Sequence, residues 1–406
     1  MTVHAWLGAV DAARLLGVNR ATLYAYVSRG FIRSQAAPGA TRERMYSHDD
    51  VTRLRRRTEE RRAPDKAAAH ALQWGMPVLE SSIALIDGRS LYYRGVDAAV
   101  LARSQSLEDV AALIWSAHLE AVPQRPDARR IASPLRSNAP FVARAQSMLA
   151  AAAADDPLAM DLRPAHVAAT GLRIVRLLAM AATGAAAVAR NVDHVLAHKW
   201  RVGARGADVL RAALVLCADH ELNVSSFTAR CVASAGSHPY AVVIAGLAAL
   251  EGPKHGGASA RVEAMLESMR RSRPLRAAVN ARLRRGESID GFGHPLYRDG
   301  DPRARVLLEM LGERYATSAE YRFIVDFVRA ATAATREQPN VDFALAAVAR
   351  VLKLPAGSPL KLFAIGRSVG WIGHALEQYA AGQLIRPRAK YVGVAIGQRS
   401  NGKSQR

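Results

Sequence analysis

Most of the chain places its apolar residues at helical spacing rather than in the alternating pattern of a strand. Val262, Met265, Leu266 and Met269 fall at i, i+3, i+4 and i+7, the spacing of one buried helical face. Alanine-rich stretches such as "AAATGLRIVRLLAMAATGAAAVA" are typical of helices, and alternation of Val, Ile and Thr is scarce. These patterns predict an all-α protein.

The first 62 residues have the pattern of a small module of three helices. The apolar positions of its first two helices are Ala12, Leu15, Leu16, Leu23, Tyr26 and Val27. Gly17 breaks the first helix, Asn19 is a good N-cap for the second, and Gly30 ends the second. A polar loop, "RSQAAPGATRERMYS", leads to a third helix that opens at "HDDVTRLRRR".

The motifs "LGV", "TLYAYVSRG" and "DVTRL" in this module resemble the winged helix-turn-helix of the MerR and excisionase-like family. The resemblance implies that the second helix enters the major groove of DNA and that the following loop forms a wing. The residues that it places toward DNA are Arg20, Tyr24, Tyr26, Arg29, Arg42 and Arg44, the last two in the wing. The alternatives are a helical domain used for protein contacts and a relic that no longer binds DNA.

Composition changes mark the borders of the remaining regions. Residues 63–75 form a charged linker with a break at Pro64, residues 76–400 form the second region, and residues 401–406 form a polar, basic tail that we expect to be disordered. The sequence therefore predicts two folded regions of unequal size.

One histidine of the second region lies in an unusual local sequence. His255 stands between a proline turn and two glycines in "GPKHGGA", directly before a predicted helix. The unpaired N–H groups and the dipole at a helix N-terminus disfavour positive charge, so a histidine there tends to stay neutral and to donate a hydrogen bond. An ordinary glycine turn or a generic anion site has the same pattern.

Five stretches of the second region are better explained together than singly. They are "SIALIDGRSLYYRGVDAAVLA", "DHELNVSSFTAR", "GPKHGGA", "GFGHPLYRDGDPRARVL" and "PNVDFALAAV". With "GRSVGWIGHALEQ" they closely resemble the citrate synthase family, from about Pro77 to Gly393. The resemblance implies a citrate synthase fold with a large and a small helical domain, the small one at about residues 256–350.

The resemblance assigns catalysis to His255, His294 and Asp342. Joining acetyl-CoA to oxaloacetate requires removal of a proton from a weakly acidic methyl group, for which a carboxylate of ordinary pKa is a feeble base. Asp342 is the implied base, and neutral His255 donates to the thioester oxygen, where negative charge develops. His294 hydrogen-bonds the ketone of oxaloacetate and protonates the forming alkoxide. The implied products are citrate and coenzyme A.

Oxaloacetate is a dicarboxylate, and guanidinium groups match carboxylates bidentately. The resemblance assigns oxaloacetate or citrate binding to His220, Arg303, Arg367 and Arg386, and contact with coenzyme A to Arg298. In the family the arginine at the position of Arg386 comes from the other subunit, which implies a homodimer with shared sites.

The spacing of the histidines gives no metal-binding pattern. His220, His255 and His294 are separated by 35 and 39 residues (255 − 220 and 294 − 255), and no glutamate pairs with them as in a zinc-binding helix. Cys217 and Cys231 give neither a disulfide framework nor a zinc motif. We therefore expect no metal and no tightly bound cofactor, with acetyl-CoA as a co-substrate.

The net charge indicates which partners the chain could bind, and the hydropathy indicates whether it could enter a membrane. The net charge is +21, of which residues 1–66 contribute +6 (13 − 7) and the other 340 residues +15 (43 − 28). Such a balance favours nucleic acid or phosphorylated substrates, although a solvated basic surface explains it equally well. The apolar run "AVVIAGLAAL" is shorter than the roughly 20 residues that span a bilayer. We expect a cytoplasmic protein with no membrane segment.

Two other functions are compatible with the sequence. The family pattern after "NVDF" commonly continues with tyrosine, serine and glycine, but this chain has Ala344, Leu345 and Ala346. Pro295 and Asp299 also depart from the pattern of many members. The chain could therefore use propionyl-CoA as a 2-methylcitrate synthase, or could be a DNA-binding metabolite sensor with a citrate-synthase-like body. The intact set of candidate catalytic residues favours an enzyme.

Overall fold

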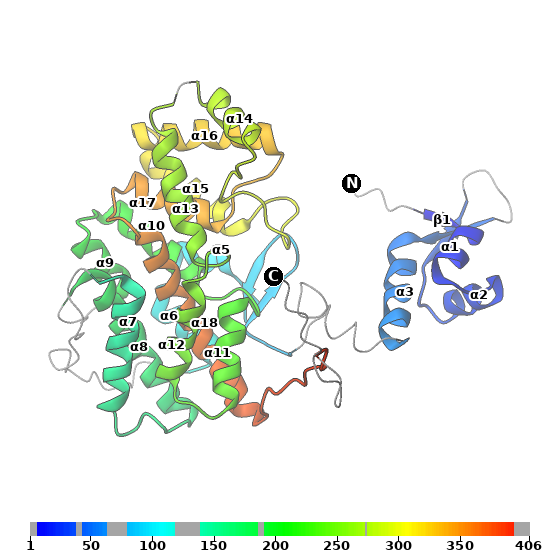
Figure 1. Ribbon diagram of the computed structural model, residues 1–406, viewed down its shortest axis with the longest axis horizontal. Coiled ribbons are helices and arrows are strands. Elements are labelled where there is room, and N and C mark those ends of the chain that lie inside the picture. The colour runs from blue at the N-terminus through cyan, green and yellow to red at the C-terminus, as the bar shows by residue number, and fades with distance from the viewer. Residues whose placement is uncertain are drawn as a thin grey trace, which may run out of the picture. The chain divides into compact units, whose positions relative to one another are not determined.

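The computed structural model describes residues 6–37, 43–62, 79–117, 139–185, 191–272 and 274–393 of the chain. The chain divides into two compact units, Met1–Glu80 and Ser81–Arg406, which are described separately (Figure 1). We call them the N-terminal and the C-terminal unit. The predicted linker at 63–75 and the predicted tail at 401–406 lie outside the described residues.

The N-terminal unit is a module of three helices with a small antiparallel sheet of order β1-β3-β2. Its elements are β1 (Trp6–Gly8), α1 (Ala9–Leu16), α2 (Arg20–Ser28), β2 (Ser34–Ala36), β3 (Arg44–Ser47) and α3 (His48–Arg62). Gly17 ends α1 in a left-handed conformation with φ 65°, and the side chain of Asn19 accepts from the N–H of Thr22 at 2.8 Å. The three predicted helices are confirmed.

An ion pair between a buried carboxylate and an exposed arginine, together with an apolar cluster, holds this module together. The buried apolar residues are Ala12, Ala13, Leu23, Ile32, Tyr46 and Val51. The buried carboxylate of Asp50 accepts from Nε of Arg33 at 2.8 Å, and this hydrogen bond lowers the pKa of Asp50 to about 2. The pair connects the segment after α2 to the first turn of α3.

The C-terminal unit begins with three short antiparallel strands that the sequence patterns do not predict. They are β4 (Ala84–Ile86), β5 (Leu91–Tyr93) and β6 (Val96–Asp97). In the β4–β5 turn, the side chain of Asp87 accepts from the N–H groups of Arg89 and Ser90. The buried hydroxyl of Tyr93 donates to the carbonyl of Val215 at 3.0 Å, so the sheet supports the end of a helix that leads into the candidate site.

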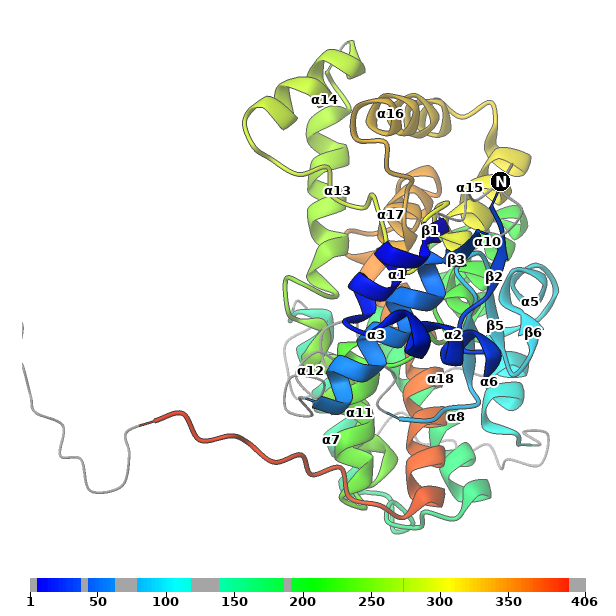
Figure 2. The same cartoon turned by 90° about the vertical axis from the view of Figure 1, so that its right-hand side faces the viewer.

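Helices make up most of the remaining described residues of this unit, as the sequence predicts. In chain order they are α5 (Ala98–Ser104), α6 (Leu107–Trp115), α7 (Phe141–Ala154), α8 (Pro164–Thr183), α9 (Val192–Lys199), α10 (Ala204–Leu216), α11 (Val224–Ser234), α12 (Pro239–Leu250), α13 (Gly257–Met269), α14 (Leu275–Arg284), α15 (Pro302–Tyr315), α16 (Ala319–Thr335), α17 (Val341–Val351) and α18 (Ser358–Ala381). Helices α14 and α16 lie at one end of the unit, away from α7, α8 and α11 (Figures 1 and 2).

Helix α18 is the core helix of the larger part of this unit. It contacts α6, α8, α10, α11, α12, α13 and α17. Every residue from Leu362 to Ala375 is buried, as expected for a helix that is covered on all sides. Among the described helices, α8 alone is long and apolar enough to cross a membrane, but 72% of its most apolar window is buried inside the fold.

Helices α13 to α17 pack on one another in a second group. Contacts join α13 to α17, α14 to α16, and α15 to α17. The rings of Phe292, Phe327 and Phe343 meet between them, with centroids 5.0 to 6.2 Å apart. These helices coincide with the smaller domain expected at about residues 256–350, whose limits stay a prediction.

A glycine permits a close helix contact near the candidate site. A Cβ atom on Gly246 of α12 would lie only 2.7 Å from Cδ2 of Trp371 of α18. The fully buried indole of Trp371 donates from Nε1 to Oγ of Ser225 in α11 at 3.2 Å. Because glycine has no Cβ atom, residue 246 leaves the space that the indole of Trp371 occupies beside the candidate site.

We predict that Gly246→Ala lowers the free energy of unfolding by about 1–3 kcal/mol, because the added methyl group overpacks the contact with Trp371. Gly203→Ala is the control, since a Cβ there has no atom within 4 Å and only the N-cap preference is lost. Urea denaturation measures both effects, and an equal loss in the two variants would contradict the packing argument.

Candidate active site

Six of the seven residues predicted for catalysis and oxaloacetate binding lie close together in the C-terminal unit. They are His220, His255 and His294 in loops, Arg303 and Asp342 in the first turns of α15 and α17, and Arg367 in the middle of α18. The ring centroids of His220 and His294 are 5.1 Å apart. Together with burial, the positive charges of Arg303 and Arg367 are close enough to lower the pKa values of the three histidines, and the charge of Arg303 opposes the rise that burial causes in the pKa of Asp342. Segments far apart in sequence therefore form one site.

His255 is a neutral side chain held by a chain of hydrogen bonds. It lies in the turn before α13, and burial, with help from the charge of Arg367, lowers its pKa to about 4. Its Nε2 is 2.8 Å from Oγ of Ser225. Ser225 also receives the indole N–H of Trp371 and donates to Oδ1 of Asn223 at 2.7 Å. This confirms the position before a helix start that the sequence predicts for His255.

His220 and His294 form a second cluster together with Tyr297. Nε2 of His220 is 3.0 Å from the hydroxyl of Tyr297, and the rings of His294 and Tyr297 are 4.9 Å apart. Burial holds the pKa of His220 far below its ordinary value, and burial with the charge of Arg303 lowers the pKa of His294 to about 4. Both imidazoles are therefore neutral near pH 7.

The tautomer of His294 follows from a backbone contact. The N–H of Leu296 donates to Nδ1 of His294 at 3.2 Å, so this nitrogen carries a lone pair. The proton of the neutral ring is then on Nε2, which can donate a hydrogen bond to a ligand.

Arg303 is a buried cation that is paired within its own helix turn. Its guanidinium donates from Nε to Oδ1 of Asp301 at 2.9 Å and from an Nη to Oδ2 at 2.8 Å. Burial alone would lower the pKa of Arg303, but the Asp301 carboxylate raises it above its ordinary value. The same carboxylate caps α15 by accepting from the N–H of Arg303.

Arg367 is a buried cation with an incomplete set of hydrogen bonds. It is 1% exposed, its Nε donates to the carbonyl of Cys217 at 2.8 Å, and its guanidinium lies over the ring of Phe363 at 4.7 Å. Its Nη2 is buried and has no hydrogen-bond partner in the described structure. An anion is the ligand that would satisfy this group.

Asp342 is the carboxylate of the site. It lies in the first turn of α17, behind the N-cap Asn340, whose side chain accepts from the N–H of Asp342 at 3.1 Å. Burial raises the pKa of Asp342 above its ordinary value, while a hydrogen bond from Oγ of Ser259 at 2.7 Å opposes the shift. The proton affinity of Asp342 is therefore greater than that of an exposed carboxylate.

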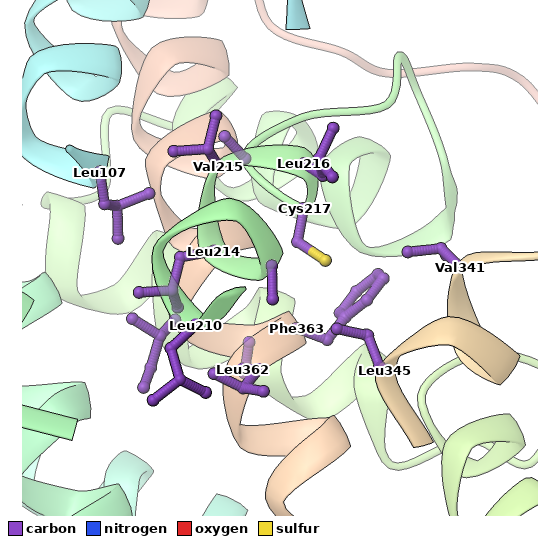
Figure 3. Packing of buried hydrophobic residues seen from close by; sticks show 14 of the residues in the cluster. Leu107, Leu210, Leu214, Val215, Leu216, Cys217, Val341, Leu345, Leu362 and Phe363 are labelled. Atoms are coloured by element: carbon purple, nitrogen blue, oxygen red, sulfur yellow. The ribbon is translucent and has the colours of Figure 1, made fainter. Parts of the chain in front are cut away.

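Buried apolar side chains are sequence neighbours or contacts of these polar groups. Figure 3 shows four of them packed in the core: Cys217 at the end of α10, Val341 and Leu345 of α17, and Phe363 of α18. Phe363 meets the ring of His255 edge-on at 5.8 Å. Burial in the core raises the pKa of the Cys217 thiol to about 12, so the thiol stays protonated at neutral pH.

Two predicted residues do not join this cluster. Arg386 is exposed in the segment that follows the end of α18 at Gly382, and the helix itself runs about four turns beyond Arg367 at 3.6 residues per turn. Arg298 is exposed in the loop that carries His294 and Tyr297. Arg386 therefore does not complete the site of its own chain, and Arg298 lies at its margin.

The predicted DNA-facing residues of the N-terminal unit divide into three groups. Arg20, Tyr24 and Arg29 are exposed along α2 and at its end, and Arg44 is exposed on β3, where it donates to the hydroxyl of Ser34. Tyr26 is half-buried: it packs against the apolar cluster of the module and meets Phe31 edge-on at 6.3 Å, so only part of its side chain faces solvent. Arg42 lies outside the described residues.

Four residues that the sequence analysis did not single out support the site. They are Ser225, Ser259, Tyr297 and Asp301, which hold His255, Asp342, His220 and Arg303 respectively. Ser225, Tyr297 and Asp301 stand inside quoted motifs and Ser259 directly follows one, but a serine, tyrosine or aspartate in a loop or first turn has no local signal of its partner. Only the position of Asp301 before "PR" indicates an N-cap.

Comparison with known proteins matches each of the two units to a protein family. The family described as "Citrate synthase, C-terminal domain" matches residues 71–388, and "MerR HTH family regulatory protein" matches residues 9–58. A crystal structure of citrate synthase from Thermotoga maritima MSB8 superimposes with a TM-score of 0.66 at 26% identity, covering 80% of this chain and 96% of that chain. The predicted fold of each unit is confirmed.

Curated relatives agree with this placement. Citrate synthase of Synechocystis sp. is 30% identical, with 79% of this chain and 89% of the relative aligned. Citrate synthase 2 of Bacillus subtilis is 40% identical over 46% of this chain, and 2-methylcitrate synthase of Shewanella oneidensis is 35% identical over 49%. The matched part spans about half the length of the latter two proteins, 51% and 54%.

The histidine pKa values predict how stability depends on pH. The pKa of His255 is about 4 in the folded chain, below its ordinary value of 6.5, so the unfolded chain binds more protons between these values. The free energy of unfolding should therefore fall as the pH is lowered through this window. In His255→Gln this decrease should be smaller, because one of the contributing groups is gone.

Urea denaturation at several pH values between about 7 and 4 measures this dependence. His194→Gln, which changes an exposed histidine of α9, is the control and should follow the wild-type profile. An equally steep decrease in His255→Gln and in the wild type would show that His255 does not titrate with a lowered pKa.

Proposed function

The chain belongs to the citrate synthase family, and we propose that it condenses acetyl-CoA with oxaloacetate and water to give citrate and coenzyme A. The observation that carries this proposal is the convergence of two neutral histidines, a half-buried carboxylate of raised pKa and a buried, incompletely bonded arginine. These are the groups needed to hold a dicarboxylate and to form an enolate beside it.

Oxaloacetate binding is proposed for the arginine side of the site. Arg367 has a buried Nη2 in need of an acceptor, and Arg303 presents a fixed guanidinium on the ring of Tyr297 at 5.8 Å. His220 lies beside both cations and stays neutral, so it can assist as a hydrogen-bond donor or acceptor. We assign the remaining contact to Arg386 of a second copy, since Arg386 does not reach the site of its own chain.

Proton abstraction is proposed for Asp342 and His255. Asp342 takes a proton from the methyl group of acetyl-CoA, and its raised pKa makes it a stronger base than an ordinary carboxylate. His255 donates a hydrogen bond to the thioester oxygen as negative charge forms there. The hydroxyl of Ser225 has one proton, which it donates to Oδ1 of Asn223 in this structure. In the proposed reaction the hydroxyl turns this proton to Nε2 of His255, so that the ring carries its own proton on Nδ1, where it can donate to the thioester.

Carbon–carbon bond formation completes the proposed reaction. The enolate carbon attacks the ketone carbon of oxaloacetate, and the oxygen of that ketone becomes an alkoxide. Nε2 of His294 donates a hydrogen bond to this oxygen and then its proton. Water hydrolyses the resulting thioester, which releases coenzyme A and citrate. We assign contact with the coenzyme A phosphates to the exposed Arg298.

A related reaction with propionyl-CoA is the second candidate for this site. The chain is 35% identical to 2-methylcitrate synthase of Shewanella oneidensis over half its length. One extra methylene changes binding in an apolar pocket by only about 1–3 kcal/mol, so the same site can accept either acyl group. The ratio of the two kcat/KM values identifies the preferred substrate.

DNA binding is proposed for the N-terminal unit, separately from the reaction. Residues 9–58 match a MerR-type regulatory family, and Arg20, Tyr24, Arg29 and Arg44 are exposed in this unit. Exposed arginines of a helix and a wing are suited to contact bases and phosphates. A chain that binds DNA but has no condensing activity would instead be a sensor that uses the site to bind a metabolite.

We predict oxaloacetate-dependent release of coenzyme A from acetyl-CoA or propionyl-CoA, followed with a thiol reagent. Asp342→Asn should reduce kcat by roughly 10²–10⁴-fold, because the general base is lost. Asp326→Asn, which changes an exposed carboxylate of α16, is the control and should keep wild-type activity. No release by the folded wild-type protein would refute the enzyme and favour the sensor.

We predict that the full-length chain retards genomic DNA fragments in a gel-shift assay at low salt. Arg20→Ala combined with Arg29→Ala should weaken this binding, because both cations are expected to contact the duplex. Arg329→Ala, an exposed arginine of the C-terminal unit, is the matched control. Binding that is unchanged when residues 1–62 are removed would rule out the N-terminal unit as the DNA-binding part.

A further inference from the structure

We propose that Ser259 is a positioning residue that orients the carboxylate of Asp342 and selects the oxygen that removes the proton. The inference rests on the function proposed for Asp342. Ser259 lies in the first turn of α13 and is 1% exposed. Its Oγ donates to Oδ1 of Asp342 at 2.7 Å, a bond between residues 83 positions apart.

This hydrogen bond makes the two oxygens of Asp342 unequal. Oδ1 is occupied by the hydroxyl of Ser259, and no hydrogen bond to Oδ2 occurs within the described structure. A carboxylate on a short side chain can otherwise rotate about its last bond. Because Oδ1 is held by Ser259, we assign removal of the methyl proton of the acyl group to Oδ2.

The same bond also couples the base to the thioester donor. His255 and Ser259 are four residues apart at the start of α13, where the N–H of Ser259 bonds to the carbonyl of Gly256 at 3.3 Å. A Cβ on Gly256 would lie 2.4 Å from the carbonyl of Leu250, so this start is packed tightly on the end of α12. The start of α13 therefore fixes the position of His255 directly and the orientation of the Asp342 carboxylate through Ser259.

Ser259 has a second effect, on proton affinity. Burial raises the pKa of Asp342, and the hydrogen bond from Ser259 stabilises the ionised carboxylate against that shift. A residue without a hydroxyl at position 259 should therefore raise the pKa of Asp342 further, so that less of the base is ionised near neutral pH. A serine that only fills space in α13 would have neither effect.

The kinetic test compares Ser259→Ala with Ser268→Ala, which removes another hydroxyl of α13, one that donates to the carbonyl of Met265. Ser259→Ala should lower kcat by roughly tenfold or more and leave the KM for oxaloacetate near its wild-type value. The acidic limb of kcat/KM should move to higher pH. The deuterium isotope effect with trideuteroacetyl-CoA should increase, since proton removal becomes slower. Ser268→Ala should change none of these.

A second measurement does not depend on turnover. Carboxylate ¹³C NMR of the aspartate-labelled protein, with the Asp342 signal assigned from its loss in Asp342→Asn, reports the pKa of Asp342 directly. The signal should titrate at higher pH in Ser259→Ala and return toward the wild-type value in Ser259→Thr, which restores a hydroxyl. If the Thr variant is unfolded, the Ala result decides.

The outcomes separate this inference from the proposed function. An inactive wild type in which Ser259→Ala still shifts the Asp342 titration would refute the enzyme but support the hydrogen bond as a control of this carboxylate. An active wild type with identical pH profiles, isotope effects and titrations in Ser259→Ala and Ser268→Ala would overturn the inference.

Discussion

The carboxylate of Asp301 fixes the starts of the two helices on which the candidate site depends. It caps α15, holds the guanidinium of Arg303 at two points and accepts from the N–H of Val341 at 3.0 Å, one residue before Asp342. Because Asp301 is 3% exposed, these bonds must replace the hydration that the charge has lost. Without this carboxylate, Arg303 would be an uncompensated buried charge and α17 would lose an anchor. A non-reacting ion pair thus sets the place of the proposed base.

Burial shifts the three histidines and Asp342 toward their uncharged forms. It lowers the pKa of His255 and His294 to about 4 and raises that of Asp342. Neutral imidazoles can donate protons without repelling cations, and a carboxylate of raised pKa is a stronger base. Arg367 keeps its charge in the same environment with one nitrogen unsatisfied, an arrangement that is costly unless an anionic ligand completes it. The proposed dicarboxylate substrate supplies that anion.

The sequence predicts those features that local chemistry determines. Asn19 caps a helix, Gly17 ends one, and His255 precedes one, because each depends only on its neighbours. The strands β4 to β6 have two or three residues each, too few for an alternating pattern. Ser259 and Tyr297 were not found because their partners lie 83 and 77 residues away, and a sequence without an alignment has no signal of such contacts. Motif resemblance named the residues proposed to react but gave no indication of the residues that hold them.

The most direct test of this account is whether the site forms a carbon–carbon bond between two separately bound substrates. The measurement is mass spectrometry of the products after incubation of the full-length protein with oxaloacetate and acetyl-CoA labelled with ¹³C in both acetyl carbons. The account predicts a tricarboxylate that contains both labelled carbons, formed together with free coenzyme A. Label found only in acetate, or left entirely in acetyl-CoA, would contradict it.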